Sequence, residues 1–301
     1  MGLTAASVFH DRVYLGFRDG GSQSPALEQL STMPSLPGSA PSGALTDMGA
    51  TLMPGIGGGA MIDSMAVFGP ASGDGLYLAN SRGFTRTTAP SPGVCQAVLL
   101  LLLDCGDWTD VTPNALAYTA KVALATTKTS DLEPADRAIP AFASFGGRLY
   151  AARNTTTGPQ LWVCNPALTG SANQCEQGDW SLLAANTAGD TQATQFNDAN
   201  NASMTLLAAT SQHLYVGFNN SVRGVVLYRS ANSAAASAAD FTGRLGCNAS
   251  TAGCAGLGGD GLGASLTHLY DGRALTLGGT DYLYVAAGTG TSPVRIYRAS
   301  P

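Results

Sequence analysis

Charged residues are scarce in this sequence, and lysine is almost missing. Asp, Glu, Lys and Arg together make up 12% of the 301 residues, against roughly 25% in an average soluble domain. Lys121 and Lys128 are the two lysines, and the net charge is −5. Proteins that bind nucleic acid or anionic lipid surfaces use clustered basic side chains. The scattered basic residues of this chain therefore argue against both kinds of partner.

A long hydrophobic run is also missing. The longest aliphatic stretch, residues 97–103, is much shorter than the roughly 20 residues of a membrane-spanning helix. His10, Asp11 and Arg12 lie near the start of the chain, where they would interrupt the apolar segment of a signal peptide. We therefore expect no membrane span and no signal peptide in this sequence. An exported form would have lost a segment that preceded Met1.

The common catalytic motifs are missing as well. The sequence contains no G-x-S-x-G, no H-E-x-x-H and no phosphate-binding loop, and it has three histidines. These motifs place a nucleophilic serine, a zinc ion or a nucleotide phosphate. Serine hydrolysis, zinc proteolysis and nucleotide chemistry therefore have no support.

Glycine and apolar residues are abundant. The sequence contains 38 glycines, and 45% of its residues are hydrophobic, which is enough to bury a core. Glycine together with many Ser, Thr and Asn residues is typical of turns between short strands. This composition indicates an all-β protein.

One motif recurs five times: a small apolar strand, a polar turn, and a strand with an aliphatic residue followed by tyrosine. The copies occupy residues 7–16, 65–79, 142–152, 206–217 and 274–286. Their tyrosines are 63, 73, 65 and 69 residues apart. A third strand with an aromatic residue recurs at residues 160–164, 226–229 and 294–298, and a fourth strand recurs at residues 106–111 and 178–183.

Four strands in one repeat predict one blade of a β-propeller, slightly longer than the roughly 50 residues of a kelch repeat. The small residues two and three places after each tyrosine would let strands approach closely. A β-sandwich with chance similarity is the alternative. We expect an all-β fold, a β-propeller of about five four-stranded blades, as a single domain over 1–301. The expected repeats lie near 2–60, 61–137, 138–202, 203–272 and 273–301.

The last copy ends after Arg298, before a fourth strand. Either the fifth blade has three strands, or the chain is cut from a longer one.

The stretch from Phe196–Asn201 through residues 214–219 to residues 227–229 resembles a repeat of uncharacterised secreted bacterial proteins. In that repeat an Asn-rich turn precedes a Leu-Tyr strand and then a strand that carries a tryptophan. The layout is also similar to kelch repeats. The resemblance implies a β-propeller, and it implies no particular activity.

Six cysteines fall into three close pairs: Cys95 and Cys105, Cys164 and Cys175, Cys247 and Cys254. We expect these neighbours to form disulfides, each contributing roughly 3 kcal/mol in the chain-entropy model. Zinc binding is the alternative, but no pair has C-x2-C spacing. Disulfides persist in oxidising compartments, so we expect a secreted, periplasmic or cell-surface protein.

Polar residues follow the tyrosine strands by three or four positions, and the repeat would place them at one end of the blades. Loops at such a rim commonly bind ligands, and planar polar groups suit sugar hydroxyls. Bonding to turn backbone is the alternative role. The candidate ligand-binding residues are Arg18, Asn80, Arg153, Asn154 and Asn219.

Acidic turns offer a candidate metal site. Asp198 and Asn200 lie in an oxygen-rich loop that could hold calcium, although Asn and Asp also cap their own turns. No cofactor is expected apart from this candidate calcium. Asp107 and Asp179 precede tryptophans on the fourth strands, and we expect them to bond nearby backbone amides. A glycosidase would need two carboxylates roughly 5–10 Å apart.

Five consecutive leucines lie between Cys95 and Cys105. If this loop is exposed, Leu99, Leu101 and Leu103 form an apolar patch that marks a contact with a protein partner. If it is a buried strand edge, it has no special role.

These observations favour a non-enzymatic extracellular binding or adhesion module that recognises a glycan or a protein. A propeller glycoside hydrolase or lyase is one alternative. A structural domain of a larger exported or surface assembly, docking through the leucine loop, is another.

We predict that the six cysteines are oxidised in the native protein, because each pair closes a short loop. Mass spectrometry after alkylation, with and without reductant, counts the free thiols. Six free thiols in the unreduced protein would contradict the extracellular interpretation.

Overall fold

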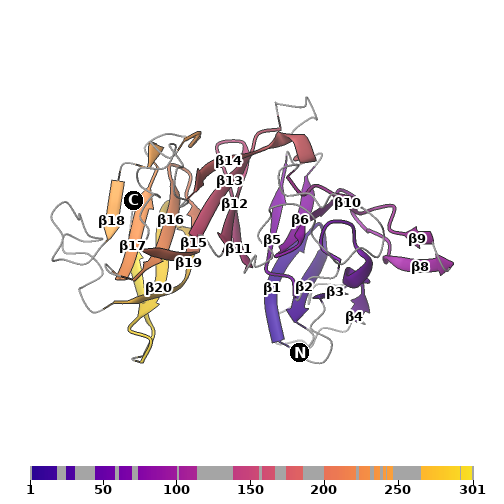
Figure 1. Cartoon of the computed structure of the whole chain (residues 1–301), viewed down its shortest axis with the longest axis horizontal. Helices are drawn as coiled ribbons and strands as arrows, with labels where there is room; N and C mark the ends of the chain where they lie inside the picture. Colours follow the sequence, from indigo (N-terminus) through magenta and orange to yellow (C-terminus); the bar gives the residue numbers. More distant parts are fainter. Residues whose placement is uncertain are drawn as a thin grey trace. The chain divides into compact units, whose positions relative to one another are not determined.

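The part of the chain that the computed structural model describes consists of strands joined by turns and the two short 3-10 helices η1 and η3 (Figure 1). It describes residues 2–18, 25–30, 45–57, 61–69, 74–99, 102–113, 138–155, 158–166, 174–185, 200–221, 224–230, 234–237, 240–241, 243–246, 266–291 and 293–299.

The first two sheets and their connections use elements from the first part of the chain. These are β1 (Gly2–Phe9), β2 (Arg12–Arg18), β3 (Pro25–Leu30), β4 (Leu45–Asp47), η1 (Ala50–Leu52), β5 (Ser64–Phe68), β6 (Gly75–Asn80), β7 (Gly83–Thr87), β8 (Gln96–Leu99), β9 (Leu102–Asp104) and β10 (Thr109–Asp110).

The remaining three sheets use the later elements. These are β11 (Ala138–Phe145), β12 (Arg148–Thr155), β13 (Gly158–Cys164), η3 (Gln177–Asp179), β14 (Trp180–Ala185), β15 (Asn201–Ala209), β16 (Leu214–Asn220), β17 (Gly224–Arg229), β18 (Gly243–Gly246), β19 (His268–Leu277), β20 (Thr280–Gly288) and β21 (Arg295–Ala299).

The strand orders are those of propeller blades. They are β1-β2-β3-β4, β10-β7-β6-β5, β11-β12-β13-β14, β15-β16-β17-β18 and β19-β20-β21, and a separate hairpin pairs β8 with β9. Every pairing in the first, second, fourth and fifth sheets is antiparallel. The predicted fold is confirmed: the chain is an all-β, five-bladed propeller with four-stranded blades and a three-stranded last blade.

The repeated tyrosine is a core residue of the blades. Tyr14, Tyr77, Tyr150 and Tyr215 are buried in the second strands of blades one to four. A buried phenol needs a hydrogen-bond partner, and each of the first three has one. The Tyr14 oxygen accepts from Gln29 Nε2, the Tyr77 oxygen accepts from the Cys175 amide, and the Tyr150 hydroxyl donates to the Ala235 carbonyl.

The small residue two places after the tyrosine allows close approach of strands, as predicted. A Cβ at Gly16 would lie 2.7 Å from Met65 Cε and 2.8 Å from Ile62 Cβ. A Cβ at Gly217 would lie 2.6 Å from Leu227 Cδ2 and 3.0 Å from Leu206 Cβ. Glycine is therefore required at both positions by packing.

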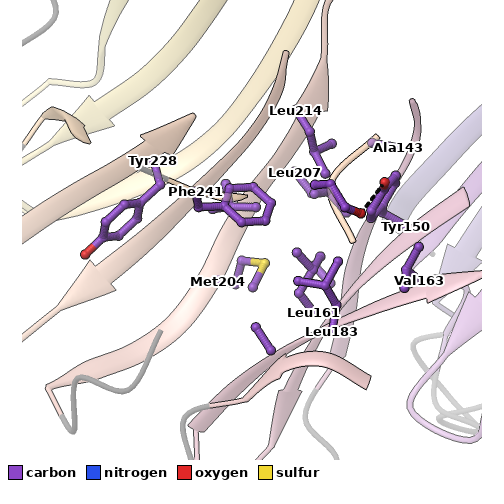
Figure 2. Close-up of a cluster of buried hydrophobic side chains, with 14 of the residues drawn as sticks. Ala143, Tyr150, Leu161, Val163, Leu183, Met204, Leu207, Leu214, Tyr228 and Phe241 are labelled. Atoms are coloured by element: carbon purple, nitrogen blue, oxygen red, sulfur yellow. Dashed lines mark hydrogen bonds between the residues drawn. The ribbon is translucent and has the colours of Figure 1, made fainter. Parts of the chain in front are cut away.

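The described residues fall into two compact units. Unit 1 contains Met1–Ile139 and Asn165–Trp180, and unit 2 contains Pro140–Cys164 and Ser181–Pro301. Each unit has its own apolar core. The unit 1 core is centred on Phe9, Tyr14, Leu27, Met53 and Ile56. The unit 2 core combines side chains of β12, β13, β15, β16 and β17, and Figure 2 shows it with Tyr150 and Met204 among its members.

The first strand of several blades carries a β-bulge near its start. The register with the second strand shifts between Leu3 and Ala5, between Met204 and Leu206, and between Leu269 and Asp271. The extra residues are therefore Thr4, Thr205 and Tyr270. A bulge re-aims the extra side chain away from the regular alternation of the strand.

Blade two has the same irregularity directly before β5. Ser64 pairs with Ala79, and the Asp63 amide also donates to the Ala79 carbonyl at 2.9 Å. Two residues therefore oppose one, which places Asp63 at the extra position of a bulge.

In unit 2, the first strand of one blade is held by an asparagine of the preceding blade. Asn154 on β12 donates from Nδ2 to the Met204 carbonyl at 2.9 Å and accepts from the Met204 amide at 2.8 Å. Asn219 on β16 makes the same pair of bonds to Leu269, at 3.1 and 2.6 Å. Both contacts satisfy backbone groups at the free edge of a sheet, which would otherwise be left without partners.

We predict that Asn154→Ala destabilises unit 2 by about 2–3 kcal/mol, because it leaves two buried backbone groups of Met204 without partners. Urea denaturation measures the change. Gln212→Ala, in an exposed turn, is the matched control and should change stability by less than about 0.5 kcal/mol. Equal stability of the two variants would contradict the role of Asn154.

Candidate functional site

Most of the rim residues proposed from the sequence use their polar groups within the fold. Asn80 is buried, and its side chain donates to the Ile56 carbonyl and accepts from the Arg82 amide. Arg153 is also buried and donates to Gln160 Oε1 at 2.6 Å. Asn154 and Asn219 bond the next blade, as described above.

Arg18 differs from the other rim candidates because it lies exposed at the end of β2. A ligand-binding role for these five residues stays a prediction. The alternative was that they bond the backbone, and Asn80, Asn154 and Asn219 make such bonds.

The candidate calcium loop is described in part. Asn200 is exposed and its carbonyl accepts from the Ser221 amide, while Asp198 lies outside the described residues. Within the described ranges, no group of three or more His, Cys, Asp or Glu side chains could hold a metal ion.

The leucine loop is a hairpin that projects from the body of unit 1 (Figure 1). Gln96 pairs with Asp104 and Leu99 with Leu102. Val98 is 54% exposed. Leu101 and the side chains of Leu99 and Leu103 lie outside what the structure describes, so the contact patch remains a prediction.

Four cysteines are disulfide-bonded. Cys95 and Cys105 form the bridge at the base of the leucine hairpin, with their Cα atoms 4.5 Å apart. Cys164 and Cys175 are also disulfide-bonded. Cys247 and Cys254 lie outside the described residues. The bridges fit a protein of an oxidising, extracellular environment.

The aspartates of the two Asp-Trp pairs bond nearby backbone amides, as expected. Asp107 accepts a 2.6 Å bond from the Gly93 amide, and Asp179 accepts a 2.8 Å bond from the Glu176 amide at the start of η3. These carboxylates are therefore engaged in turn and cap bonds.

Asp63 is the carboxylate with the most unusual environment, and sequence reasoning missed it. The side chain is half-buried, and its Oδ2 accepts a 3.0 Å bond from the Ile139 amide in β11. Burial raises the pKa of Asp63 from 3.8 to about 6, although the Ile139 bond works in the opposite direction. Next to it, the Oγ of buried Ser64 has no hydrogen-bond partner among the described residues.

This environment suits proton transfer. A carboxyl group with a pKa near 6 is largely protonated in mildly acidic solution and can act as a general acid. The Ile139 amide occupies Oδ2, so Oδ1 is the oxygen that carries the proton. A strand end also holds the carboxyl group more rigidly than a loop would.

The solved structures that the chain matches include several glycosidases. An α-L-arabinanase from Cellvibrio cellulosa is 12% identical with a TM-score of 0.40, and the match covers 98% of this chain and 93% of that one. An α-L-arabinofuranosidase from Lactobacillus brevis is 9% identical with a TM-score of 0.43, covering 98% and 89%. The β-xylosidase RS223 is 10% identical with a TM-score of 0.38, covering 98% and 90%.

No family model and no curated protein matches the chain. The propeller fold that the resemblance to kelch-like repeats implied is confirmed. Membership of the kelch-like repeat family is not.

Our first functional hypothesis, a non-enzymatic binding or adhesion module, is wrong. The matches that overturn it are to an arabinanase, an arabinofuranosidase and a β-xylosidase, and a prolyl endopeptidase is matched as well. The weak similarity assigns no residue and no substrate to this chain, so these must come from its own side chains.

Among the described residues, no helix is long and apolar enough to cross a membrane.

We predict that Asp63 makes the protein less stable as the pH rises from about 4 to about 6. The folded state holds the Asp63 proton more tightly than the unfolded state, because its pKa is about 6 instead of 3.8. The contribution of Asp63 to stability is therefore greatest below pH 4 and falls until the carboxyl is ionised in both states. Asp63→Asn should remove this fall and raise stability at neutral pH by on the order of 1–3 kcal/mol.

Thermal unfolding between pH 3.5 and 8 measures both proteins. Asp281→Asn is a control of opposite sign, because hydrogen bonds from Ser211 and Thr276 lower the pKa of Asp281. That variant should lose stability above pH 4. Identical pH profiles for Asp63→Asn and the unaltered protein would contradict the burial of the Asp63 charge.

Proposed function

We propose that the protein is an extracellular glycoside hydrolase in which Asp63 is the general acid. The observation that supports this proposal is the Asp63 carboxyl group at a bulged strand start, half-buried and with its pKa raised to about 6. A glycosidic bond breaks when its oxygen receives a proton, and a carboxyl group with a raised pKa is the usual donor.

The proton moves from Asp63 Oδ1 to the glycosidic oxygen as the bond to the anomeric carbon breaks. Positive charge then spreads over the anomeric carbon and the ring oxygen. Water adds to that carbon, and its proton goes to a second carboxylate, which restores neutrality. The Ile139 amide stabilises the Asp63 carboxylate left after proton transfer, because an N–H bond favours the charged form.

The disulfides suit an enzyme that works outside the cytoplasm. The proposed substrate class is neutral polysaccharide. Its test set consists of arabinan, xylan, arabinoxylan and dextran, together with nitrophenyl glycosides of the same sugars.

We predict that Asp63→Asn lowers kcat at least about 100-fold with little change in KM, because it removes the proton donor. The wild-type rate should fall as pH rises through about 6, where Asp63 ionises. Reducing-sugar release and nitrophenol absorbance measure the two substrate types.

Asp107→Asn is the matched control, because Asp107 bonds a turn amide, and it should keep at least half of the activity. Replacing the other carboxylates of unit 1 by amides identifies the second catalytic group. Full activity of Asp63→Asn, or no hydrolysis of any substrate by the wild type, would refute the proposal.

A further inference from the structure

The start of β19 presents an aromatic and polar surface on a rigid strand. Leu269 is buried, and Asn219 bonds both its amide and its carbonyl. On either side of Leu269, the side chains of His268 and Tyr270 are exposed. Asn219 thus holds the strand at Leu269, and the side chains of the two neighbouring residues face solvent.

The two rings are held in fixed orientations. They lie nearly parallel, with 22° between their planes and 6.1 Å between their centroids. The His268 ring packs on Gly290, where a Cβ would come within 2.8 Å of Cε1. His268 Nδ1 is 2.8 Å from the Thr267 hydroxyl oxygen, and this contact leaves Nε2 for a ligand.

Tyr270 is 44% exposed, and the residues that follow it in β19 are polar. The Asp271 carboxylate accepts from the Gly272 amide and lies 3.5 Å from Arg273 Nε. The hydroxyls of Thr289 and Thr291 lie 3.5 Å apart in the following turn. An exposed aromatic ring with polar neighbours of both donor and acceptor type suits the packing of a sugar ring.

Blade four has the same bulge and the same asparagine bonds, with Ser203, Thr205 and Leu206 at the corresponding register positions. Leu206 is buried and packs on Gly272 of blade five, whereas His268, Tyr270 and Asp271 are exposed. The bulge and the asparagine bonds therefore form without an aromatic residue at the extra position, and the exposed Tyr270 ring is available for a ligand.

We propose that His268, Tyr270 and Asp271 form a carbohydrate-binding subsite on unit 2. One neutral sugar ring packs on Tyr270, and its hydroxyls bond His268 Nε2 and the Asp271 carboxylate. The assignment of the ligand as neutral polysaccharide rests on the proposed function, whereas the location of the subsite rests on unit 2 alone.

Affinity electrophoresis in gels containing arabinan, xylan, arabinoxylan or dextran measures binding, and the Asp63→Asn protein is used so that the polysaccharide is not consumed. Tyr270→Ala should weaken binding about threefold to tenfold, because it removes the stacking surface. Tyr270→Phe keeps the ring and should bind within about twofold of the parent.

Tyr282→Ala is the matched control, since Tyr282 lies on the same blade with Arg298 over its ring at 4.9 Å. It should leave binding unchanged. The subsite is refuted if Tyr270→Ala binds normally, if Tyr282→Ala weakens binding equally, or if the parent binds none of the four polysaccharides.

The two proposals fail separately. Hydrolysis by the wild type with normal binding by Tyr270→Ala refutes the subsite alone. Binding that depends on Tyr270 in a protein with no hydrolytic activity supports the subsite and refutes the proposed function.

Discussion

The first strand of each blade is an edge strand, and its free backbone groups need hydrogen-bond partners. In three successive blades the partner is a side chain from the blade before. Asp63 bonds the Ile139 amide, Asn154 bonds both polar groups of Met204, and Asn219 bonds both polar groups of Leu269. Without these bonds the starts of β11, β15 and β19 would present unsatisfied groups.

This constraint also explains why Asp63 is chemically different from the two asparagines. An asparagine amide donates and accepts, so it satisfies a carbonyl and an amide without carrying charge. A carboxylate can accept from the amide alone, and burial penalises its charge. Asp63 lies directly before a first strand, whereas the two asparagines lie on second strands, and at this contact the carboxyl group has a pKa of about 6. Asp63 thus bonds the backbone of the next blade and, in the proposed catalysis, also donates the proton.

Much of the fold was predictable from the sequence because the repeat carries packing information. Tyrosines recur in the second strands, and small residues such as Gly16 and Gly217 recur where strands crowd. The cysteine pair at positions 95 and 105 was predictable from its spacing, which closes a short loop. Local patterns of this kind can be interpreted from the sequence, because each one reflects contacts within a blade or between adjacent strands.

The candidate site was not predictable in the same way. Asp63 is the acidic residue at the extra position of its bulge, where the other bulges that the structure describes have Thr4, Thr205 and Tyr270. An alignment of the copies at their bulges would have singled it out. The predicted rim residues Asn80 and Asn154 looked equally suited to ligands, but their amides bond the backbone.

By itself, the sequence determined the strand repeat, the blade count and the proximity of Cys95 to Cys105, because these features follow directly from its periodicity and spacing. The tertiary structure decided which polar side chains bond the backbone and which face solvent. That choice depends on contacts between residues 50 or more positions apart, such as Asn154 with Met204 and Asp63 with Ile139. Burial at the contact with Ile139 raises the pKa of Asp63. The exposure of Tyr270 likewise follows from its place in the folded blade.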